Sequence, residues 1–335
     1  MKIGVLGAGT WGMALASLLD SNGHDVTVWS AIPSEIDELV ESGVHKNLPG
    51  IILPKSINYT KDIKRIADDN RMILVVVPSS FVRATTEKIA PFLNDQAILI
   101  TAAKGIESGS LLTMTEIISD VLDRVRPELK YQVAALSGPT HAEEVAAGIP
   151  TSIVSACEDE NISQMIAEVF ANSCMRVYTN TDVKGVEICG AMKNIIAIAA
   201  GTITGMGLGD NTKAMLMTRG IAEITRLGIA MGCNRRTFMG LAGIGDLIVT
   251  CTSRHSRNNR CGELIGRGMS YEEASREIGM VVEGYHALEA AMQLSEKYGV
   301  TLPITEAVYN VIKCGLSPRD AMHALMTRDL KSELD

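Results

Sequence analysis

The stretch Lys2-Ile-Gly-Val-Leu-Gly-Ala-Gly-Thr-Trp-Gly12 decides the fold of this 335-residue chain. It places a short apolar strand directly before three spaced glycines, and the helical stretch from Met13 to Asp20 follows at once. In a βαβ nucleotide-binding unit, Gly7 permits the tight turn, Gly9 lets the backbone approach a pyrophosphate, and Gly12 lets the helix pack closely on the strand. The free N–H groups at the helix start then face the phosphates.

A second strand makes this glycine pattern specific. The pattern alone is a weak signal, because glycine-rich turns are common, but the apolar stretch from Val26 to Trp29 comes close behind it. Strand, glycine turn, helix and strand together form the context that a dinucleotide-binding unit requires. The alternative is a glycine turn in another kind of α/β protein. The context favours dinucleotide binding.

The first half of the chain alternates strand and helix signals, which is the pattern of a doubly wound parallel sheet. Several strands are continuous apolar runs, as expected where helices cover both sheet faces. We therefore expect an N-terminal Rossmann-type α/β domain over residues 1–180. Its predicted strands are Ile3 to Leu6, Val26 to Trp29, Met72 to Val77, Ala97 to Thr101, Gln132 to Leu136, Thr151 to Ser155 and Arg176 to Tyr178. Further helices are predicted at Ser80 to Pro91, Leu111 to Leu122 and Asn161 to Phe170.

The second half lacks strand signals and reads as helices broken at glycine-rich joints. The length exceeds the usual size of one core, so we expect a second, all-α domain over residues 181–335. The run Gly205-Met-Gly-Leu-Gly209 follows a helix, which predicts an interhelical loop rather than a second nucleotide turn. A sheet domain followed by a helical domain places a cleft at the carboxyl ends of the strands, where such sheets bind ligands.

The composition, 46% hydrophobic and 21% charged residues, is that of a soluble globular enzyme. A net charge of −8 argues against general affinity for nucleic acid or an anionic membrane, although it permits a local basic pocket. No uninterrupted apolar run approaches the roughly 20 residues that span a bilayer. The segment up to Ala16 superficially resembles a secretory signal, but its removal would destroy the glycine turn. We expect a cytoplasmic protein without a membrane span.

The cysteines and histidines show no metal-binding spacing. Seven cysteines are odd in number and form no CxxC pair, so neither a disulfide framework nor a zinc cage is indicated. Reduced, buried thiols are the better interpretation. The six histidines form no HExxH or similar pattern, and we expect no metal.

Lys193 is the most unusual residue of the second half. With Asn194, it interrupts an otherwise largely apolar, small-residue helix from Val186 to Ala200. Burial of an ammonium is costly without partners, and desolvation lowers its pKa toward the range where it exchanges protons. Lys193 is therefore a candidate general acid and base. The alternative is a lysine that snorkels to the helix surface.

Lys104 follows the predicted strand Ala97 to Thr101, beside a flexible glycine. The position places a cation at the carboxyl end of a strand, where a parallel sheet faces its ligand crevice. We treat Lys104 as a candidate site residue, and a solvated loop lysine is the alternative.

A third concentration of polar residues spans Leu241 to Arg260. Its three arginines, Arg254, Arg257 and Arg260, have no acid between them. Their forked donors suit a phosphate, and a solvated basic helix start is the alternative. Asp246 in the same region could hold a lysine or a substrate hydroxyl by a hydrogen bond. His255 and its neighbour Ser256 are no nucleophile pair, because adjacent residues of a helix point apart.

Taken together, the chain resembles the NAD(P)-dependent glycerol-3-phosphate dehydrogenases of the bacterial type nearly end to end. One matching block would be modest support, but many blocks in order are highly specific. The blocks are Gly7-Ala-Gly-Thr-Trp-Gly12, Ala103-Lys-Gly-Ile-Glu107, Ser137-Gly-Pro-Thr-His-Ala-Glu-Glu-Val145, Cys189-Gly-Ala-Met-Lys-Asn-Ile-Ile-Ala-Ile-Ala-Ala-Gly201, Gly209-Asp-Asn-Thr-Lys213, Gly243-Ile-Gly-Asp-Leu247, Thr250-Cys-Thr-Ser253, Ser256-Arg-Asn258 and Val281-Val-Glu-Gly284.

The resemblance implies reversible hydride transfer from NAD(P)H to dihydroxyacetone phosphate. The product, sn-glycerol 3-phosphate, is the starting backbone of glycerophospholipids. Lys193 resembles the family's acid/base lysine, which protonates the carbonyl oxygen as the hydride arrives. Lys104 resembles the lysine that binds substrate near the nicotinamide and stabilises the developing alkoxide. Asp246 matches the residue that positions Lys193 and substrate, and the family also implies a homodimer.

The remaining family positions map onto two sets of residues. The first set binds the substrate and the second binds the cofactor. By the resemblance, Ser256, Arg257 and Asn258 of the substrate set hold the phosphate, and Arg257 also lies near the cofactor. The substrate set implied by the resemblance is Lys104, Gly138, Thr140, Lys193, Asn194, Asp246, Thr250, Ser256, Arg257 and Asn258. The cofactor set is Gly7, Gly9, Thr10, Trp11, Gly12, Ser30, Lys104, Ala142, Arg257, Val281 and Glu283.

The end of the second strand, Trp29-Ser-Ala-Ile-Pro33, departs from the usual pattern. An NAD-specific site typically offers Asp or Glu to the ribose diol there, and an NADP-preferring family member commonly offers Arg. This segment has neither. Because no carboxylate repels a 2′-phosphate and Ser30 could donate a hydrogen bond, the sequence leans slightly to NADPH while allowing both.

Two other functions remain open. One is a related two-domain reductase of the hydroxyacid or 6-phosphogluconate type, which also uses a lysine on a helix of the second domain. The Ser256-Arg-Asn segment disfavours it. The other is a cofactor-sensing binding protein that has lost its chemistry. Such a protein would not need Lys104, Lys193 and Asp246 together.

Overall fold

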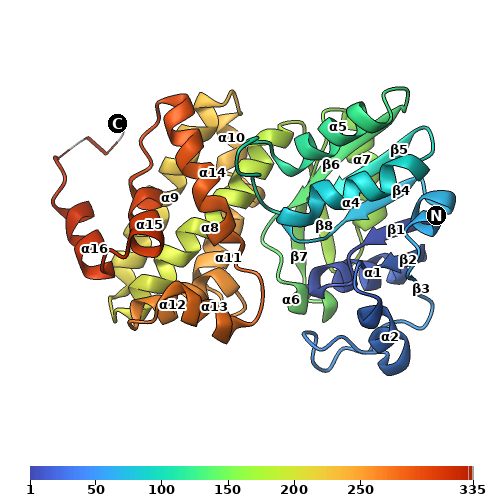
Figure 1. The fold of residues 1–335 in the computed structure, drawn as a ribbon, viewed down its shortest axis with the longest axis horizontal. Helices are drawn as coiled ribbons and strands as arrows, with labels where there is room; N and C mark the ends of the chain where they lie inside the picture. The colour runs from blue at the N-terminus through green and yellow to red at the C-terminus, as the bar shows by residue number, and fades with distance from the viewer. Residues whose placement is uncertain (331, 334–335) are drawn as a thin grey trace.

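The protein is built from an eight-stranded sheet followed by a bundle of helices (Figure 1). The computed structural model describes residues 1–330, 332 and 333. Along the sheet the strand order is β3-β2-β1-β4-β5-β6-β7-β8. The strands are β1 (Lys2–Leu6), β2 (Asp25–Trp29), β3 (Asn58–Thr60), β4 (Met72–Val75), β5 (Ala97–Thr101), β6 (Tyr131–Ser137), β7 (Thr151–Ala156) and β8 (Met175–Asn180).

The helices of the first half cover both faces of this sheet (Figure 1). They are α1 (Thr10–Ser21), α2 (Pro33–Ser42), α3 (Lys64–Asp69), α4 (Val82–Ile89), α5 (Met114–Val125), α6 (Ala142–Ala146) and α7 (Glu160–Phe170), with the short 3₁₀ turns η1 (Ser79–Phe81) and η2 (Ala90–Phe92). Burial on both faces explains the continuous apolar strands. Met72 and Leu74 of β4 join one core cluster, whereas Ile73 and Val75 join the cluster on the opposite face.

The predicted strands and helices of the first half are present, but several bounds differ: the helix expected from Leu111 begins at Met114, and the strand expected to end at Val77 ends at Val75. Helices α2, α3 and α6 were not predicted. Two further differences concern the sheet. Strand β3 was not predicted, because its three residues at the sheet edge form no apolar run. Strand β7 pairs with β6 in the antiparallel sense, so the sheet is mixed rather than wholly parallel. The connection between these strands holds only the five-residue helix α6. A crossover to a parallel neighbour usually needs a longer helix.

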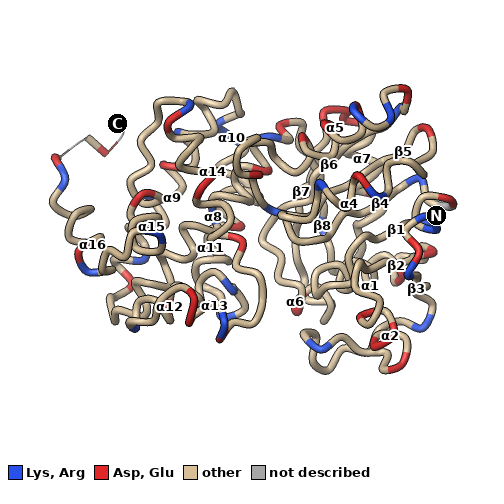
Figure 2. The backbone as a smooth tube through the Cα atoms, viewed as in Figure 1, with Lys and Arg blue, Asp and Glu red and all other residues tan. Residues whose placement is uncertain are grey.

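After β8, the part of the chain that the structure describes contains helices and no further strand. These are α8 (Val183–Gly205), α9 (Asp210–Ala230), α10 (Arg235–Phe238), the π-helical turn η3 (Leu241–Gly245), α11 (Asp246–Thr252), α12 (Arg257–Gly266), α13 (Tyr271–Ile278), α14 (Glu283–Tyr298), α15 (Pro303–Cys314) and α16 (Pro318–Met326). The segment 206–209 connects α8 to α9, so the predicted interhelical loop is confirmed. Figure 2 shows acidic and basic residues interspersed along both halves.

Helix α8 is the core of the helical half. By length and composition it is the one described helix that could cross a membrane, but 89% of its most apolar window is buried inside the protein. Helix α8 packs on α12 so closely that the backbones of the two helices are in contact. A Cβ on Gly201 would lie 1.9 Å from the Asn259 carbonyl oxygen, and one on Gly262 would lie 2.0 Å from that of Ile198. This close contact brings the start of α12 next to the middle of α8.

Candidate active site

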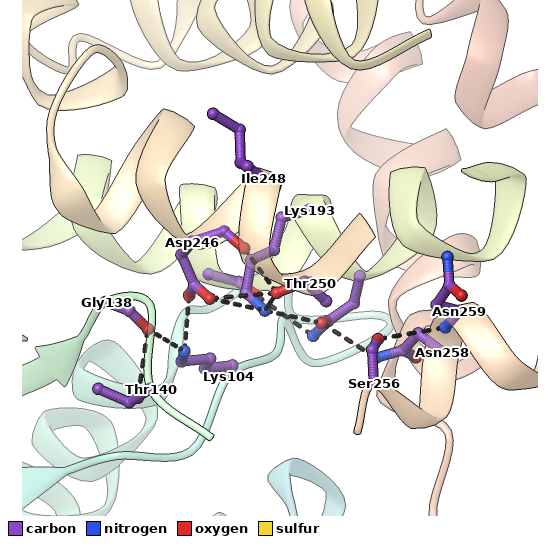
Figure 3. Close-up of polar contacts among 12 residues, drawn as sticks. Lys104, Gly138, Thr140, Lys193, Asp246, Ile248, Thr250, Ser256, Asn258 and Asn259 are labelled. Atoms are coloured by element: carbon purple, nitrogen blue, oxygen red, sulfur yellow. Dashed lines mark hydrogen bonds and ion pairs between the residues drawn. The ribbon is translucent and has the colours of Figure 1, made fainter. Parts of the chain in front are cut away.

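The site lies where the carboxyl ends of β5 and β6 meet helices α8 and α11 (Figure 3). Lys104 follows β5, Gly138 follows β6, Lys193 comes from α8, and Asp246 begins α11. The π-helical turn η3 directly precedes Asp246, and such turns are frequent at functional sites. Four segments that are remote in sequence therefore meet at the edge of the sheet where ligands bind.

Lys193 is buried, with 5% of its surface exposed, so it does not snorkel to the helix surface. Its Nζ donates to Thr250 Oγ1 at 2.7 Å and to Asn194 Oδ1 at 3.1 Å, and it lies 3.1 Å from Asp246 Oδ1. The three partners match the three N–H groups of an ammonium. Desolvation lowers the pKa of Lys193 to about 8, against the opposing attraction of Asp246 and with added repulsion from Lys104.

Asp246 joins the two lysines. Its Oδ2 accepts a hydrogen bond from Lys104 Nζ at 2.6 Å, while its Oδ1 faces Lys193. Lys104 also donates to the Gly138 carbonyl oxygen at 3.2 Å, and its side chain is 18% exposed. Lys104 is thus held at the site instead of extending into solvent. A Cβ on Gly190 would lie 3.4 Å from Lys104 Cγ, so α8 packs directly against this lysine.

An amide chain connects the cluster to the helix starts beside it. Asn258 Nδ2 donates to Asn194 Oδ1 at 3.0 Å, and Asn258 Oδ1 accepts from the Gly284 N–H at 2.9 Å. Ser256 caps α12 by accepting from the Asn259 N–H at 3.2 Å. These bonds fix α8, α12 and α14 relative to one another.

The arginines of this region are open for a ligand. Within residues 1–330, 332 and 333, no hydrogen bond or ion pair engages the side chains of Arg254, Arg257 or Arg260. Arg257 is half-buried at the first position of α12, whereas Arg254 and Arg260 are exposed. Arg257 therefore offers a fork of donors that no described acid neutralises.

The glycine turn has the shape that a pyrophosphate requires. Gly7 has φ +124°, and a Cβ on Gly12 would lie 2.0 Å from the Gly7 carbonyl oxygen. A Cβ on Gly9 would meet no described atom within 4 Å. Among the described residues, no side chain caps the start of α1 and no acid lies in its first turn. Free N–H groups and the helix dipole together suit an anion.

Three further residues expected at the cofactor, Thr10, Trp11 and Ala142, lie at or near this turn. Thr10 and Trp11 form the first turn of α1 and are half-buried, and Ala142 begins α6, which packs on α1. Two buried polar atoms at the end of β6, Ser137 Oγ and His141 Nε2, have no hydrogen-bond partner in the described part of the chain. Ser137 Oγ lies next to Gly190 of α8, on the side of Lys104, and the His141 ring lies 5.6 Å from that of His255. Unpaired buried polar atoms at this edge of the sheet fit a site that a polar ligand completes.

Two site residues were not recognised from the sequence. Ser79 holds Glu283, because its N–H and its hydroxyl donate to the two carboxylate oxygens at 3.2 and 2.5 Å. Its place after β4, at the carboxyl edge of the sheet, was an available signal. Glu35 is the second. It accepts a hydrogen bond from Ser30 Oγ at 2.6 Å, so this strand end does have a carboxylate, contrary to the premise behind the NADPH expectation.

The residues that the structure describes form no disulfide. They contain no group of three or more His, Cys, Asp or Glu that could hold a metal ion. All seven cysteines are free, and five of them are buried, as expected for reduced thiols. A glycine turn after β1 and a buried lysine and aspartate cluster after β5, at the same edge of the sheet, are the features of a nicotinamide-dependent dehydrogenase with a Rossmann-type sheet and a helical second half.

Comparison with known proteins assigns this chain within that class. Sequence models of the NAD-dependent glycerol-3-phosphate dehydrogenase N-terminus and C-terminus match residues 2–163 and 182–323. The chain belongs to the NAD-dependent glycerol-3-phosphate dehydrogenase family.

Individual relatives agree with this assignment over nearly their whole length. Glycerol-3-phosphate dehydrogenase [NAD(P)+] 2 of Lactobacillus delbrueckii subsp. bulgaricus is 54% identical, with 99% of each chain covered. The corresponding protein of Agathobacter rectalis is 46% identical over 99% of this chain and 97% of its own. The crystal structure of glycerol-3-phosphate dehydrogenase from Coxiella burnetii is similar with a TM-score of 0.92 and 35% identity, covering 98% of this chain and 99% of that one.

Proposed function

We propose that this protein reduces dihydroxyacetone phosphate to sn-glycerol 3-phosphate with NAD(P)H, reversibly, and so supplies the glycerophospholipid backbone. The observation that carries the proposal is the carboxylate of Asp246 held between the ammonium groups of Lys104 and Lys193. Family membership supports the reaction. The geometry supports the chemistry, because a buried proton donor lies beside a cation at the ligand edge of the sheet.

Lys193 is the proton donor in this mechanism. When bound, the reduced nicotinamide supplies a hydride to the carbonyl carbon of the substrate. Lys193 Nζ gives its proton to the carbonyl oxygen, and a pKa of about 8 keeps it protonated at neutral pH yet able to release the proton. In the reverse direction the neutral amine takes the proton from the hydroxyl group. Lys104 stabilises negative charge on the oxygen, and Asp246 holds both lysines in place.

The phosphate of the substrate is held by Ser256, Arg257 and Asn258. The unpaired guanidinium of Arg257 supports this role, and so does the position of the three residues at the start of α12, where N–H groups attract anions. Gly138, Thr140, Asn194 and Thr250 complete the substrate site proposed here. Asn194 and Thr250 support it through their direct hydrogen bonds to Lys193.

The cofactor occupies the glycine turn in this proposal. Gly7, Gly9 and Gly12 give the pyrophosphate room, with Thr10 and Trp11 beside it. In this proposal Val281 and Glu283 lie against the nicotinamide end, and Lys104 binds the substrate near the nicotinamide. Ala142 and Arg257 also lie near the cofactor. Residues 1–180 then form the cofactor-binding domain and residues 181–335 the substrate-binding domain. We further propose a cytoplasmic homodimer, on the basis of the family resemblance.

The test is the oxidation of the reduced nicotinamide with dihydroxyacetone phosphate, followed by absorbance with NADH and NADPH in parallel. We expect the wild-type protein to oxidise the reduced nicotinamide rapidly. We expect Arg257→Ala to lose this activity when the concentration of dihydroxyacetone phosphate is low. Assays with 6-phosphogluconate and 2-hydroxyacids address the related reductases. If the protein is folded and binds cofactor but reacts with none of these substrates, the dehydrogenase proposal is wrong. The result would then favour a cofactor-sensing binding protein.

A further inference from the structure

The ribose end of the glycine turn has a carboxylate whose role the family match leaves unassigned. Ser30 follows β2 directly, and the Gly7 N–H donates to the Trp29 carbonyl oxygen at 2.8 Å. Ser30 is therefore next to the glycine turn at the ligand edge of the sheet. Its hydroxyl donates to Glu35 Oε2 at 2.6 Å. Glu35 is half-buried, five residues beyond the strand end, in the first turn of α2.

The Ser30 hydroxyl has no proton left for a ligand. Its only proton goes to Glu35, and its oxygen accepts from the Ile32 N–H at 3.1 Å. The Ser30 hydroxyl proton that could be donated to a 2′-phosphate is therefore already donated to Glu35. The hydroxyl instead orients the Glu35 carboxylate. No other hydrogen bond to this carboxylate occurs among the described residues, so Oε1 is free to accept from a ribose hydroxyl.

The surroundings of Glu35 also disfavour a second anion. The start of α2 attracts negative charge, but Glu35 already lies in that first turn. His45 is buried nearby, and desolvation lowers its pKa although the Glu35 carboxylate opposes this. Its imidazole is therefore neutral at pH 7. Lys46 is exposed beside it and is the cation that could offset Glu35.

We propose that Glu35, oriented by Ser30, is the residue that selects the cofactor, and that it makes the enzyme prefer NAD(H) over NADP(H). The carboxylate accepts from the adenosine ribose hydroxyls and repels a 2′-phosphate, as the acidic residue at the strand end does in other NAD sites. Here it comes from the following helix instead of the strand, which is why the sequence pattern missed it. The inference rests on the proposed dehydrogenase function and replaces the slight lean to NADPH.

The test measures binding without substrate. NADH and NADPH are titrated onto the whole protein by nicotinamide fluorescence, and 5′-ADP and adenosine 2′,5′-bisphosphate compete as paired probes of the 2′-phosphate. The wild-type protein should bind NADH at least about fivefold more tightly than NADPH. Glu35→Gln keeps the size and the hydrogen bond but removes the charge, so the ratio should fall by about fivefold or more, since the repulsion of two unit charges a few ångströms apart in water changes affinity roughly fivefold.

The control is Glu41→Gln, the same charge change in the last turn of α2 at an exposed position. It should leave the ratio unchanged. Ser30→Ala should weaken NADH binding a few-fold by releasing Glu35. A wild-type preference below about fivefold, or a Glu35→Gln ratio that stays near the wild-type one, overturns the proposal. A purely structural role for Glu35 would give that second result.

The outcome is separate from that of the proposed function. If the protein binds NADH selectively but does not reduce dihydroxyacetone phosphate, the proposed reaction fails and the selectivity stands. If it reduces the substrate equally well with both cofactors and binds them equally, only the role of Glu35 fails.

Discussion

Helix α8 carries two buried ionisable residues within two turns, Glu187 and Lys193, and their roles differ. Both are almost fully buried, with 6% and 5% of their surfaces exposed. Desolvation acts on both, raising the pKa of Glu187 to about 7 and lowering that of Lys193 to about 8. Glu187 accepts from the N–H and the hydroxyl of Thr115, at 2.9 and 2.5 Å. It thereby caps the first turn of α5, in the sheet half of the chain.

The difference lies in the balance of charge around each group. The partners of Glu187 are neutral donors that satisfy it within the protein. Around Lys193, two ammonium groups share one carboxylate, which leaves one positive charge at this edge of the sheet. Hydrogen bonds from neutral donors compensate the burial of Glu187 and join α8 to α5, whereas the unbalanced charge beside Lys193 can act on a ligand. Four changes test this contrast.

Lys193→Met should have the largest effect. Loss of the proton donor should lower the turnover of dihydroxyacetone phosphate roughly 100- to 10,000-fold. The free energy of unfolding should change little, because Met fills the site without the desolvation cost and Lys104 still pairs with Asp246. Steady-state kinetics, denaturant unfolding and NADH binding measure the three quantities. Near-normal turnover would end the assignment of Lys193 as the acid.

Asp246→Asn should affect both function and stability. Without the carboxylate, two cations face each other and the attraction that raises the pKa of Lys193 is lost. Turnover should fall by about 100-fold, and unfolding should become easier by about 3 kcal/mol, as for a buried ion pair that loses one partner. A variant that lost stability but kept turnover would show Asp246 to be structural, like Glu187.

Glu187→Ala should reverse the pattern. It leaves the buried Thr115 N–H unpaired and opens a cavity, so the free energy of unfolding should fall by about 2–4 kcal/mol. Turnover at a temperature where the variant is folded should stay within about threefold of wild type. Glu187→Gln is the matched control, because it keeps an acceptor for the N–H and should recover most of the stability. A large loss of turnover in the Gln variant would contradict the structural role.

The last change is the pH, to which the stability contributions of the two groups respond with opposite sign. The pKa of Glu187 is raised from 4.5, so its contribution to stability is present below pH 4.5 and is lost as the pH rises through about 7. Lys193 has a lowered pKa, so the unfolded chain binds more protons between pH 8 and 10.5 and stability rises there. Unfolding curves across pH, with Glu187→Gln and Lys193→Met as references, separate these terms.

Turnover should also depend on the protonation of Lys193, and steady-state kinetics over the same pH range measure it. The reduction needs the ammonium, so its turnover should fall as the pH rises through about 8, while the oxidation of glycerol 3-phosphate should increase. The residual activity of Lys193→Met should lack this transition. If the transition persisted in that variant, another group would be its source.

Local patterns predicted most of the fold. The apolar strands, the glycine turn and the end of the sheet at residue 180 are confirmed, because each depends on burial or backbone freedom that neighbouring residues set. Lys193 was recognised because a charge in an apolar helix is visible in the sequence. Strand β3 and the antiparallel β7 were missed, since edge position and strand direction depend on the neighbours in the sheet.

The sequence by itself determined the dinucleotide turn, the division into sheet and helices, and the family. The spacing of glycines and the periodicity of apolar residues are local properties, so they can be recognised in the sequence alone. Only the tertiary structure decided that Asp246 lies between Lys104 and Lys193, that Glu187 caps α5, and that Glu35 reaches Ser30. Which charges face one another follows from how distant helices pack, and periodicity fixes which side chains are buried but not what lies opposite them.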